Sequence, residues 1–157
     1  MSLKLNGKST RVRSGSMPAV VAKMKELQGL NQNVIKLHAG DVVSGSLFFT
    51  LFKGQADAAL MNGVCFDALA LGNHEFNEGD AGLAKFLDFL NAGDCSTPVL
   101  AAKIKPEVGV STLTPNSATD YIQPYTVMQI DGIKIGVVGI DIVRKTKLSS
   151  SPDESIV

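Results

Sequence analysis

The apolar positions of the chain repeat with two different spacings, one typical of helices and one typical of buried strands. Apolar residues recur every three or four positions over residues 16–29 and 80–93, which predicts an amphipathic helix in each segment. Residues 55–62, made largely of Ala, Leu and Met, predict a further helix between them. Ser16 and Asp80 are residue types that cap helix N-termini, so we expect the two amphipathic helices to begin there. The stripe expected to bury the last helix comprises Leu83, Phe86, Leu87 and Leu90.

Short apolar runs between these helices predict three strands, at residues 34–37, 66–71 and 99–104. Residues 41–54, rich in Gly, Ser and Phe, and residues 105–120, which include two prolines, are expected to be loops. Helix and strand thus alternate at least three times. This alternation is typical of an α/β fold in which parallel strands form one sheet and helices pack against it.

The two ends of the chain show other patterns. Asp131-Gly132 separates two apolar-rich runs, residues 125–130 and 133–140, and this dipeptide predicts a tight hairpin turn. Residues 1–15 lack periodicity, so we expect an irregular, exposed lead-in. Residues 146–157 are rich in Ser and charged residues, and we expect an irregular tail.

Length and composition bound the class of protein. The 157 residues suffice for one domain or for part of a larger one, and 45% apolar with 19% charged residues is typical of globular proteins. Fifteen basic and fifteen acidic residues give a net charge of zero, so electrostatics offers no argument for a nucleic-acid polymer or an anionic membrane as partner. No apolar run approaches the roughly 18 residues that span a bilayer, and we expect no signal peptide because the charged N-terminus lacks an apolar core.

Two cysteines, Cys65 and Cys95, exclude a disulfide framework and leave one bridge open. Cys65 follows an apolar run, which favours a reduced, buried thiol. The cellular compartment therefore stays open on composition alone.

Polar side chains suited to metal and proton chemistry follow two of the predicted strands. Gly40-Asp41 ends the first strand, and Gly72-Asn73-His74 ends the second. Because the carboxyl ends of parallel strands share one sheet edge, we expect these groups to lie close together. A carboxylate, an amide oxygen and an imidazole are parts of a metal-assisted hydrolytic site, although two metals need further ligands. On the residues alone, a helix-capping Gly-Asp turn and a plain Asn-His turn stay open as alternatives.

The two motifs also carry a family resemblance. His38-Ala39-Gly40-Asp41 and Gly72-Asn73-His74-Glu75-Phe76 resemble the second and third signature motifs of the calcineurin-like metallophosphoesterases. More narrowly, residues 41–79 resemble the bacterial 5′-nucleotidase and UDP-sugar hydrolase family, and the similarity extends over residues 16–145. The resemblance implies a partial metallophosphoesterase domain, part of a four-layer α/β/β/α sandwich without its first strand and C-terminal part. It also implies hydrolysis of nucleotide phosphoesters with two divalent metal ions, whether Zn, Mn, Mg, Co or Fe.

The resemblance assigns roles to individual residues. Asp41 matches the aspartate that bridges the two metals, Asn73 matches an amide ligand of the second metal, and His74 matches the catalytic histidine. The family orients that histidine with an aspartate three residues later, where this chain has Asn77. An amide can hydrogen-bond the imidazole but cannot offset an imidazolium charge, so Asn77 is the second catalytic candidate, with a weaker bias toward protonated His74.

The resemblance gives no metal-binding or catalytic role to two further residues near the motifs, His38 and Lys103. For His38 we favour packing beside the site over metal ligation. Lys103 stands where the family usually has Asn, and the sequence gives no reason for the exchange.

The resemblance implies more metal ligands than this chain contains. An Asp-x-His motif at the end of the family's first strand has no match, and the chain has only two histidines. We therefore expect a central fragment of a periplasmic or extracellular nucleotidase, with an exposed sheet edge available for self-association. The alternative substrates are 2′,3′-cyclic nucleotides and UDP-sugars, and the alternative class is a non-catalytic remnant or interaction module.

Overall fold

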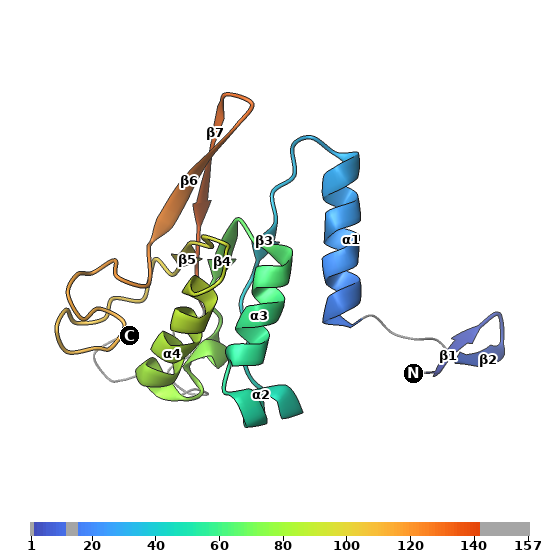
Figure 1. The fold of residues 1–157 in the computed structure, drawn as a ribbon, viewed down its shortest axis with the longest axis horizontal. Coiled ribbons are helices and arrows are strands. Elements are labelled where there is room, and N and C mark those ends of the chain that lie inside the picture. Colours follow the sequence, from blue (N-terminus) through green and yellow to red (C-terminus); the bar gives the residue numbers. More distant parts are fainter. Residues whose placement is uncertain (1, 12–15, 142–157) are drawn as a thin grey trace.

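A computed structural model describes residues 2–11 and 16–141 and has a mixed α/β architecture (Figure 1). Its central sheet has the order β3 (Leu37–His38), β4 (Ala68–Ala70), β5 (Val99–Leu100), with both pairs parallel. The predicted α/β class with parallel strands is confirmed. The four-layer arrangement stays a prediction for a longer protein.

The strands are shorter than predicted, because near their ends the backbone bonds to a side chain or to an isolated residue instead of to a neighbouring strand. The Lys36 amide donates to the Asp67 carboxylate at 2.7 Å, and the Ala101 amide donates to the Gln123 carbonyl at 2.8 Å. Hydrogen bonds are therefore made along most of the predicted runs, but a regular ladder exists only at their centres.

Helices α3 (Gln55–Val64) and α4 (Gly79–Asn91) supply most of the helical side of the core. The predicted stripe of α4 is confirmed, since all four of its members are buried: Leu83, Phe86, Leu87 and Leu90. They meet Leu69 of β4, which is fully buried. A buried Leu or Phe side chain contributes on the order of 1.5–3 kcal/mol, so this contact region dominates the stability of the described residues.

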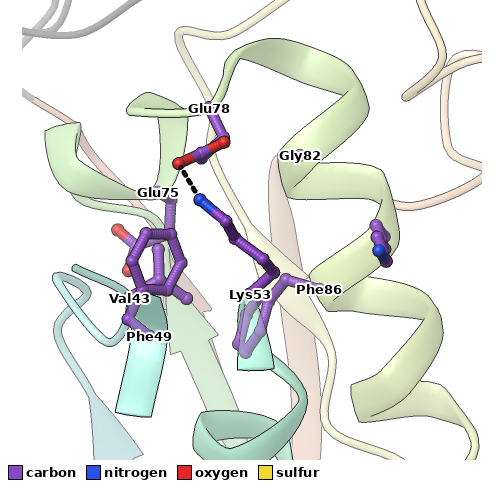
Figure 2. A pocket seen from close by; sticks show the side chains of 8 residues that line it. Val43, Phe49, Lys53, Glu75, Glu78, Gly82 and Phe86 are labelled. Atoms are coloured by element: carbon purple, nitrogen blue, oxygen red, sulfur yellow. Dashed lines mark hydrogen bonds and ion pairs between the residues drawn. The ribbon is translucent and has the colours of Figure 1, made fainter. Parts of the chain in front are cut away.

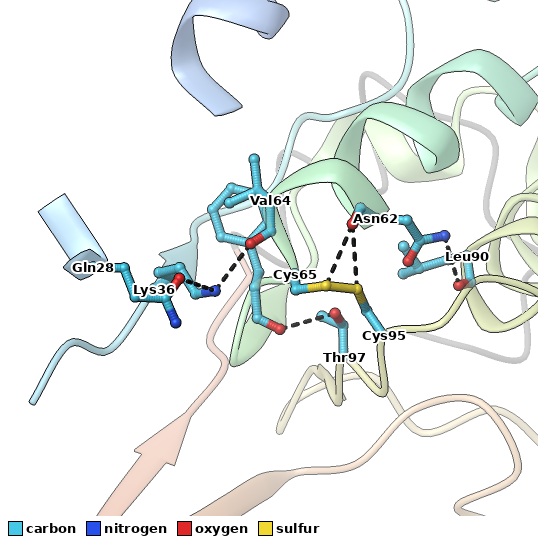
Figure 3. Close-up of a disulfide and its surroundings, with 9 residues drawn as sticks. Gln28, Lys36, Asn62, Val64, Cys65, Leu90, Cys95 and Thr97 are labelled. Atoms are coloured by element: carbon cyan, nitrogen blue, oxygen red, sulfur yellow. Dashed lines mark hydrogen bonds between the residues drawn. A yellow bond between two sulfur atoms is a disulfide. The ribbon is translucent and has the colours of Figure 1, made fainter. Parts of the chain in front are cut away.

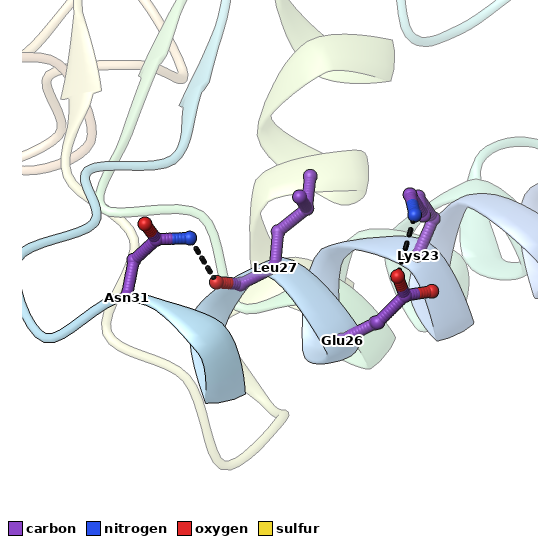
Figure 4. Close-up of polar contacts among 4 residues, drawn as sticks. All are labelled: Lys23, Glu26, Leu27 and Asn31. Carbon is purple, nitrogen blue, oxygen red and sulfur yellow. Dashed lines mark hydrogen bonds and ion pairs between the residues drawn. The ribbon is translucent and has the colours of Figure 1, made fainter.

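Helix α1 (Met17–Leu30) forms where the pattern predicts it, yet none of its residues is buried. Ser16 occupies the N-cap position, but its side chain makes no capping hydrogen bond. At the other end, the Asn31 side-chain amide donates to the Leu27 carbonyl at 2.8 Å and closes the last turn (Figure 4). Lys23 and Glu26 form an exposed ion pair on the same helix. No helix in the described ranges is both long and apolar enough to cross a membrane.

Two segments expected to be irregular are regular instead. Strands β1 (Ser2–Leu5) and β2 (Lys8–Arg11) form an antiparallel hairpin, so the irregular lead-in is wrong for these residues. Asn6-Gly7 makes the turn, with φ of 50° and 78°, which is the chemistry of a two-residue hairpin loop. Within the loop expected at 41–54, helix α2 (Leu47–Phe52) forms because the Ser46 hydroxyl accepts from the Phe49 amide.

The start of α4 also differs from the prediction. Glu78, not Asp80, holds the N-cap position, and Asp80 lies in the first turn with 1% of its surface exposed. The Asp80 carboxylate accepts the Ser111 hydroxyl at 2.5 Å instead of capping the helix. This bond draws the loop at residues 105–120 onto the core, where Leu113 is fully buried.

The predicted hairpin forms from β6 (Tyr125–Ile130) and β7 (Ile133–Val138). Asp131 and Gly132 make its turn with φ of 51° and 78°. Both strands extend away from the helices (Figure 1), and Val127 and Ile133 are more than half exposed. The tail at 146–157 lies outside the described residues.

A disulfide joins Cys65 to Cys95 (Figure 3), so the expectation of a reduced, buried thiol is wrong. Cys65 is exposed and follows α3 as its C-cap residue, with a positive φ of 53°. The Asn62 carbonyl oxygen lies 3.3 and 3.2 Å from the two sulfurs, and its side-chain amide donates to the Leu90 carbonyl at 3.0 Å. The bridge thus fixes the ends of α3 and α4 to each other.

Candidate active site

Asp41 and His74 meet at the carboxyl edge of the sheet. Each follows a parallel strand, β3 or β4, by a few residues, and the two strands are direct neighbours. The His74 backbone amide donates to Oδ1 of Asp41 at 3.1 Å. The predicted convergence of the two motifs is thus what the structure has, although the roles of these residues stay predictions.

Glycines allow the two turns to approach this closely. A Cβ on Gly40 would lie 2.3 Å from the Gly72 nitrogen, and a Cβ on Gly72 would lie 2.4 Å from Oδ1 of Asp41. Gly40 also has φ of 90°, and Asp41 follows it with φ of 58°, a region that Asp enters more readily than most residues. Only glycine at both positions is compatible with this contact between the turns.

The 3₁₀-helix η1 (Asn73–Phe76) carries Asn73 and His74, and Asn77 follows it as the C-cap residue. Phe76 is fully buried and anchors the turn, Asn73 is buried at 7% exposure, and His74 is exposed. The side-chain amide nitrogen of Asn77 lies 3.1 Å from Nδ1 of His74. The direction of this bond depends on the tautomer of His74: with the Asn77 nitrogen as donor, Nδ1 accepts and the ring proton lies on Nε2.

Sequence reasoning gave no role to Glu75, although its carboxylate joins both turns. Its oxygens accept from the amides of Gly72 at 2.7 Å, Asp41 at 2.9 Å and Val42 at 2.6 Å. Burial raises the pKa of Glu75, the three amides act in the opposite direction, and the Asp41 charge raises it further. A Glu three residues after an N-cap position is the spacing of a capping box, which was the available signal.

His38 and Lys103 lie outside this group of contacts. Nδ1 of His38 accepts from the Gly40 amide at 3.1 Å, and its ring packs edge-on against Phe66 at 5.1 Å between centroids. Burial lowers the pKa of His38, while the nearby Asp41 charge acts in the opposite direction. The geometry is that of a histidine packed beside the site. Lys103 is exposed, and nothing in the structure explains why it replaces Asn.

A cavity of about 170 Å³ is lined by side chains that include residues of α2, η1 and α4 (Figure 2). Phe49 and Phe86 form part of its wall, and Lys53 reaches across to pair with Glu78 at 2.9 Å. Glu75 also contributes to the wall. The polar groups of the cavity are thus largely engaged with one another or with backbone.

The donor types at the edge fit a divalent cation, but their number falls short of a complete dinuclear site. Asp41 offers an exposed carboxylate and Asn73 an amide oxygen, and both are hard ligands. In residues 2–11 and 16–141 no three His, Cys, Asp or Glu side chains are grouped so as to hold a metal. The described residues therefore do not form a complete metal site by themselves, and metal binding by Asp41 and Asn73 stays a prediction.

Comparison with curated proteins relates the chain to nucleotidases. It is 42% identical over 154 residues to the NAD 5′-nucleotidase of Haemophilus influenzae, and 40% identical over 156 residues to a probable 5′-nucleotidase of Treponema pallidum. These alignments cover 98% and 99% of the chain. The chain belongs to the 5′-nucleotidase family. It spans about a quarter (24%) of the length of each of these two relatives, and no family model matches it.

Solved structures of the 5′-nucleotidase family share its fold. The NAD nucleotidase of H. influenzae superposes with a TM-score of 0.88 at 41% identity, over 99% of this chain and 29% of that one. A 5′-nucleotidase precursor from Thermus thermophilus superposes with a TM-score of 0.81 at 29% identity, over 100% of this chain and 28% of that one. The architecture described above is therefore that of a segment of a 5′-nucleotidase.

Proposed function

We propose that the protein hydrolyses phosphoester bonds of nucleotides, with Asp41 and Asn73 as metal ligands and His74 as the catalytic residue. The observation that carries this proposal is the convergence of the two turns, with the His74 amide bonded to the Asp41 carboxylate. The family membership supports the same chemistry, since the relatives are named for nucleotide hydrolysis.

The residues of this chain would divide the work at the sheet edge. Asp41 and Asn73 would hold divalent ions, which supply polarisation of the phosphoryl oxygens when bound. His74, exposed beside them, would donate its Nε2 proton to a phosphoryl or leaving-group oxygen. Asn77 would hold the ring in that tautomer through its contact with Nδ1.

Nucleoside 5′-monophosphates are the first-choice substrates. The H. influenzae relative is named for NAD, so NAD joins 2′,3′-cyclic nucleotides and UDP-sugars in the panel to be tested.

A periplasmic or extracellular location is proposed as well. The Cys65–Cys95 bridge supports it, because disulfides persist mainly in oxidising compartments. Relatives from snake venom, and one named as a precursor, point the same way.

One observation favours a second candidate, a non-catalytic module. The described residues contribute two plausible metal donors, and a dinuclear site needs several more. Elemental analysis of the purified 157-residue chain, with turnover of AMP and p-nitrophenyl phosphate in added manganese, separates the two. If the chain binds metal and turns over substrate, the enzyme is supported. If it shows no bound metal and no turnover, the non-catalytic module is supported.

Substitutions then test the site assignment. In a chain that turns over AMP, His74→Ala and Asp41→Asn are each expected to lower kcat/KM by about 10²–10⁴-fold, the range typical of lost acid–base or electrostatic groups. Asp131→Asn is the matched control, since Asp131 has a φ of 51° against 58° for Asp41 and lies in the β6–β7 turn. Turnover that survives both site substitutions would refute the assignment.

A further inference from the structure

Glu75 is bonded to the backbone of both turns at the sheet edge. Oε2 accepts from Gly72 of its own turn and from Asp41 of the other, while Oε1 accepts from Val42. One carboxylate thus accepts hydrogen bonds from the amides of Asp41 and Val42, 34 and 33 positions away, and from the amide of Gly72, three positions away. Its side chain points into the interior beside Phe49 (Figure 2).

The burial of this carboxylate has no cationic compensation in the described part of the chain. Glu75 is 2% exposed and takes part in neither ion pair found there, because the nearby Lys53 is bonded to Glu78. Removing a carboxylate from water costs several kcal/mol, and three amides offset part of that cost. A buried ionic group of this kind is weak evidence for stability and is better explained by the geometry it enforces.

We propose that Glu75 is a positioning residue that sets the spacing between Asp41 and the Asn73–His74 turn. It acts through the backbone amides that it holds and does not itself touch a substrate. Its importance for metal binding rests on the proposed function, whereas its effect on the two turns does not. The two effects are therefore measured separately.

The first measurement needs no substitution. Amide nitrogens of Asp41, Val42 and Gly72 should each show a through-hydrogen-bond coupling to the Glu75 carboxylate carbon in an NMR spectrum of the labelled 157-residue chain. Absence of all three couplings, in a spectrum that detects the sheet hydrogen bonds, would overturn the proposal. This coupling measurement uses the unsubstituted chain, so it tests the proposal even if a Glu75 variant fails to fold.

The second measurement compares Glu75→Gln with the matched control Glu78→Gln. Gln keeps one oxygen but turns an NH₂ donor toward an amide, so at least one of the three bonds is lost. We expect hydrogen exchange of the Asp41, Val42 and Gly72 amides to become at least tenfold faster. Glu78→Gln, which loses only an exposed ion pair, should leave these amides unchanged.

A third measurement separates positioning from general stability. Mn²⁺ affinity of the chain should fall about 10–100-fold in Glu75→Gln, the range typical of groups that orient metal ligands. Gly93→Ala, which perturbs the opposite end of the molecule, should lower stability without moving Mn²⁺ affinity. Equal effects of the two variants on the three amides would overturn the proposal. A chain that binds no Mn²⁺, but shows the couplings and the faster exchange, would refute the metal assignment and uphold the role of Glu75.

Discussion

The carboxyl and amino ends of β4 are both tied to neighbouring segments, but by interactions of different kinds. At the carboxyl end, Gly72 packs against the Gly40 turn, and the Glu75 carboxylate accepts hydrogen bonds from backbone amides of both turns. At the amino end, a disulfide and the Asn62 side chain join α3 to the end of α4. The first end is held by polar contacts between turns, and the second by a covalent bond and a capped helix terminus.

This difference separates the part of the molecule that carries candidate chemistry from the part that carries stability. Polar contacts between turns leave Asp41 and His74 exposed at the edge, where ligands can reach them. The disulfide constrains the unfolded chain without contacting that edge. Substitutions at the two ends should therefore affect different measurements.

The largest expected effect on stability is loss of the disulfide. The bridge spans 30 residues, and the loop-closure relation gives about 3–4 kcal/mol of stabilisation for that length. A Cys65→Ser/Cys95→Ser variant should lose about that much in urea unfolding. The amides of Asp41, Val42 and Gly72 should keep their exchange rates under conditions where the variant is folded. Altered exchange confined to those amides would show that the two ends are not independent.

A methyl group at Gly72 should have a smaller effect on stability and a larger one on the site. Its Cβ would overlap the Asp41 carboxylate and backbone, and overpacking of this kind costs about 1–3 kcal/mol. We expect Gly72→Ala to shift the Asp41 and His74 amide resonances and to abolish Mn²⁺ binding. Gly136→Ala in β7 is the control, because its Cβ would meet no atom within 4 Å. Unchanged Mn²⁺ binding in Gly72→Ala would argue against the close approach of the turns.

The smallest expected effect is that of Gly93→Ala. Its Cβ would lie 2.1 Å from the Asn62 side-chain nitrogen, which would have to leave the Leu90 carbonyl. Loss of one such hydrogen bond costs about 1 kcal/mol. Urea unfolding measures this loss, and Asn62→Ala should add little to it in the double variant. Full additivity of the two substitutions would mean that Asn62 is not the group displaced.

The α/β class, the β6–β7 hairpin and the stripe of α4 could all be predicted from local pattern. Each depends on residues close in sequence, such as Asp131-Gly132 or the spacing from Leu83 to Leu90. The convergence of Asp41 and His74 could be predicted as well, because it follows from parallel strands sharing an edge.

Some of the features missed, such as the β1–β2 hairpin and α2, form from local contacts, but two others depend on partners distant in sequence. Asp80 is a residue type that caps helices, but its carboxylate accepts a hydrogen bond from the Ser111 hydroxyl, 31 residues away. Cys65 lies beside an apolar run, yet it is exposed and is bonded to Cys95, 30 residues away. Helix α1 shows the opposite case, since its pattern predicted a helix correctly but could not say that no residue of it is buried.

The Cys65–Cys95 bridge also bears on the order in which the site assembles. It closes a covalent ring that contains β4, η1 and α4, and thus Asn73, His74, Glu75 and Asn77, whereas Asp41 lies outside. Helices form in about a microsecond, while disulfides form over seconds to hours, so α4 is available to align the two cysteines before they oxidise. At these rates the Gly40-Asp41 turn can dock before oxidation as well, so the bridge locks a sheet edge that has already assembled. A reduced chain in which the His74 amide already contacts the Asp41 carboxylate is the species that such an order predicts.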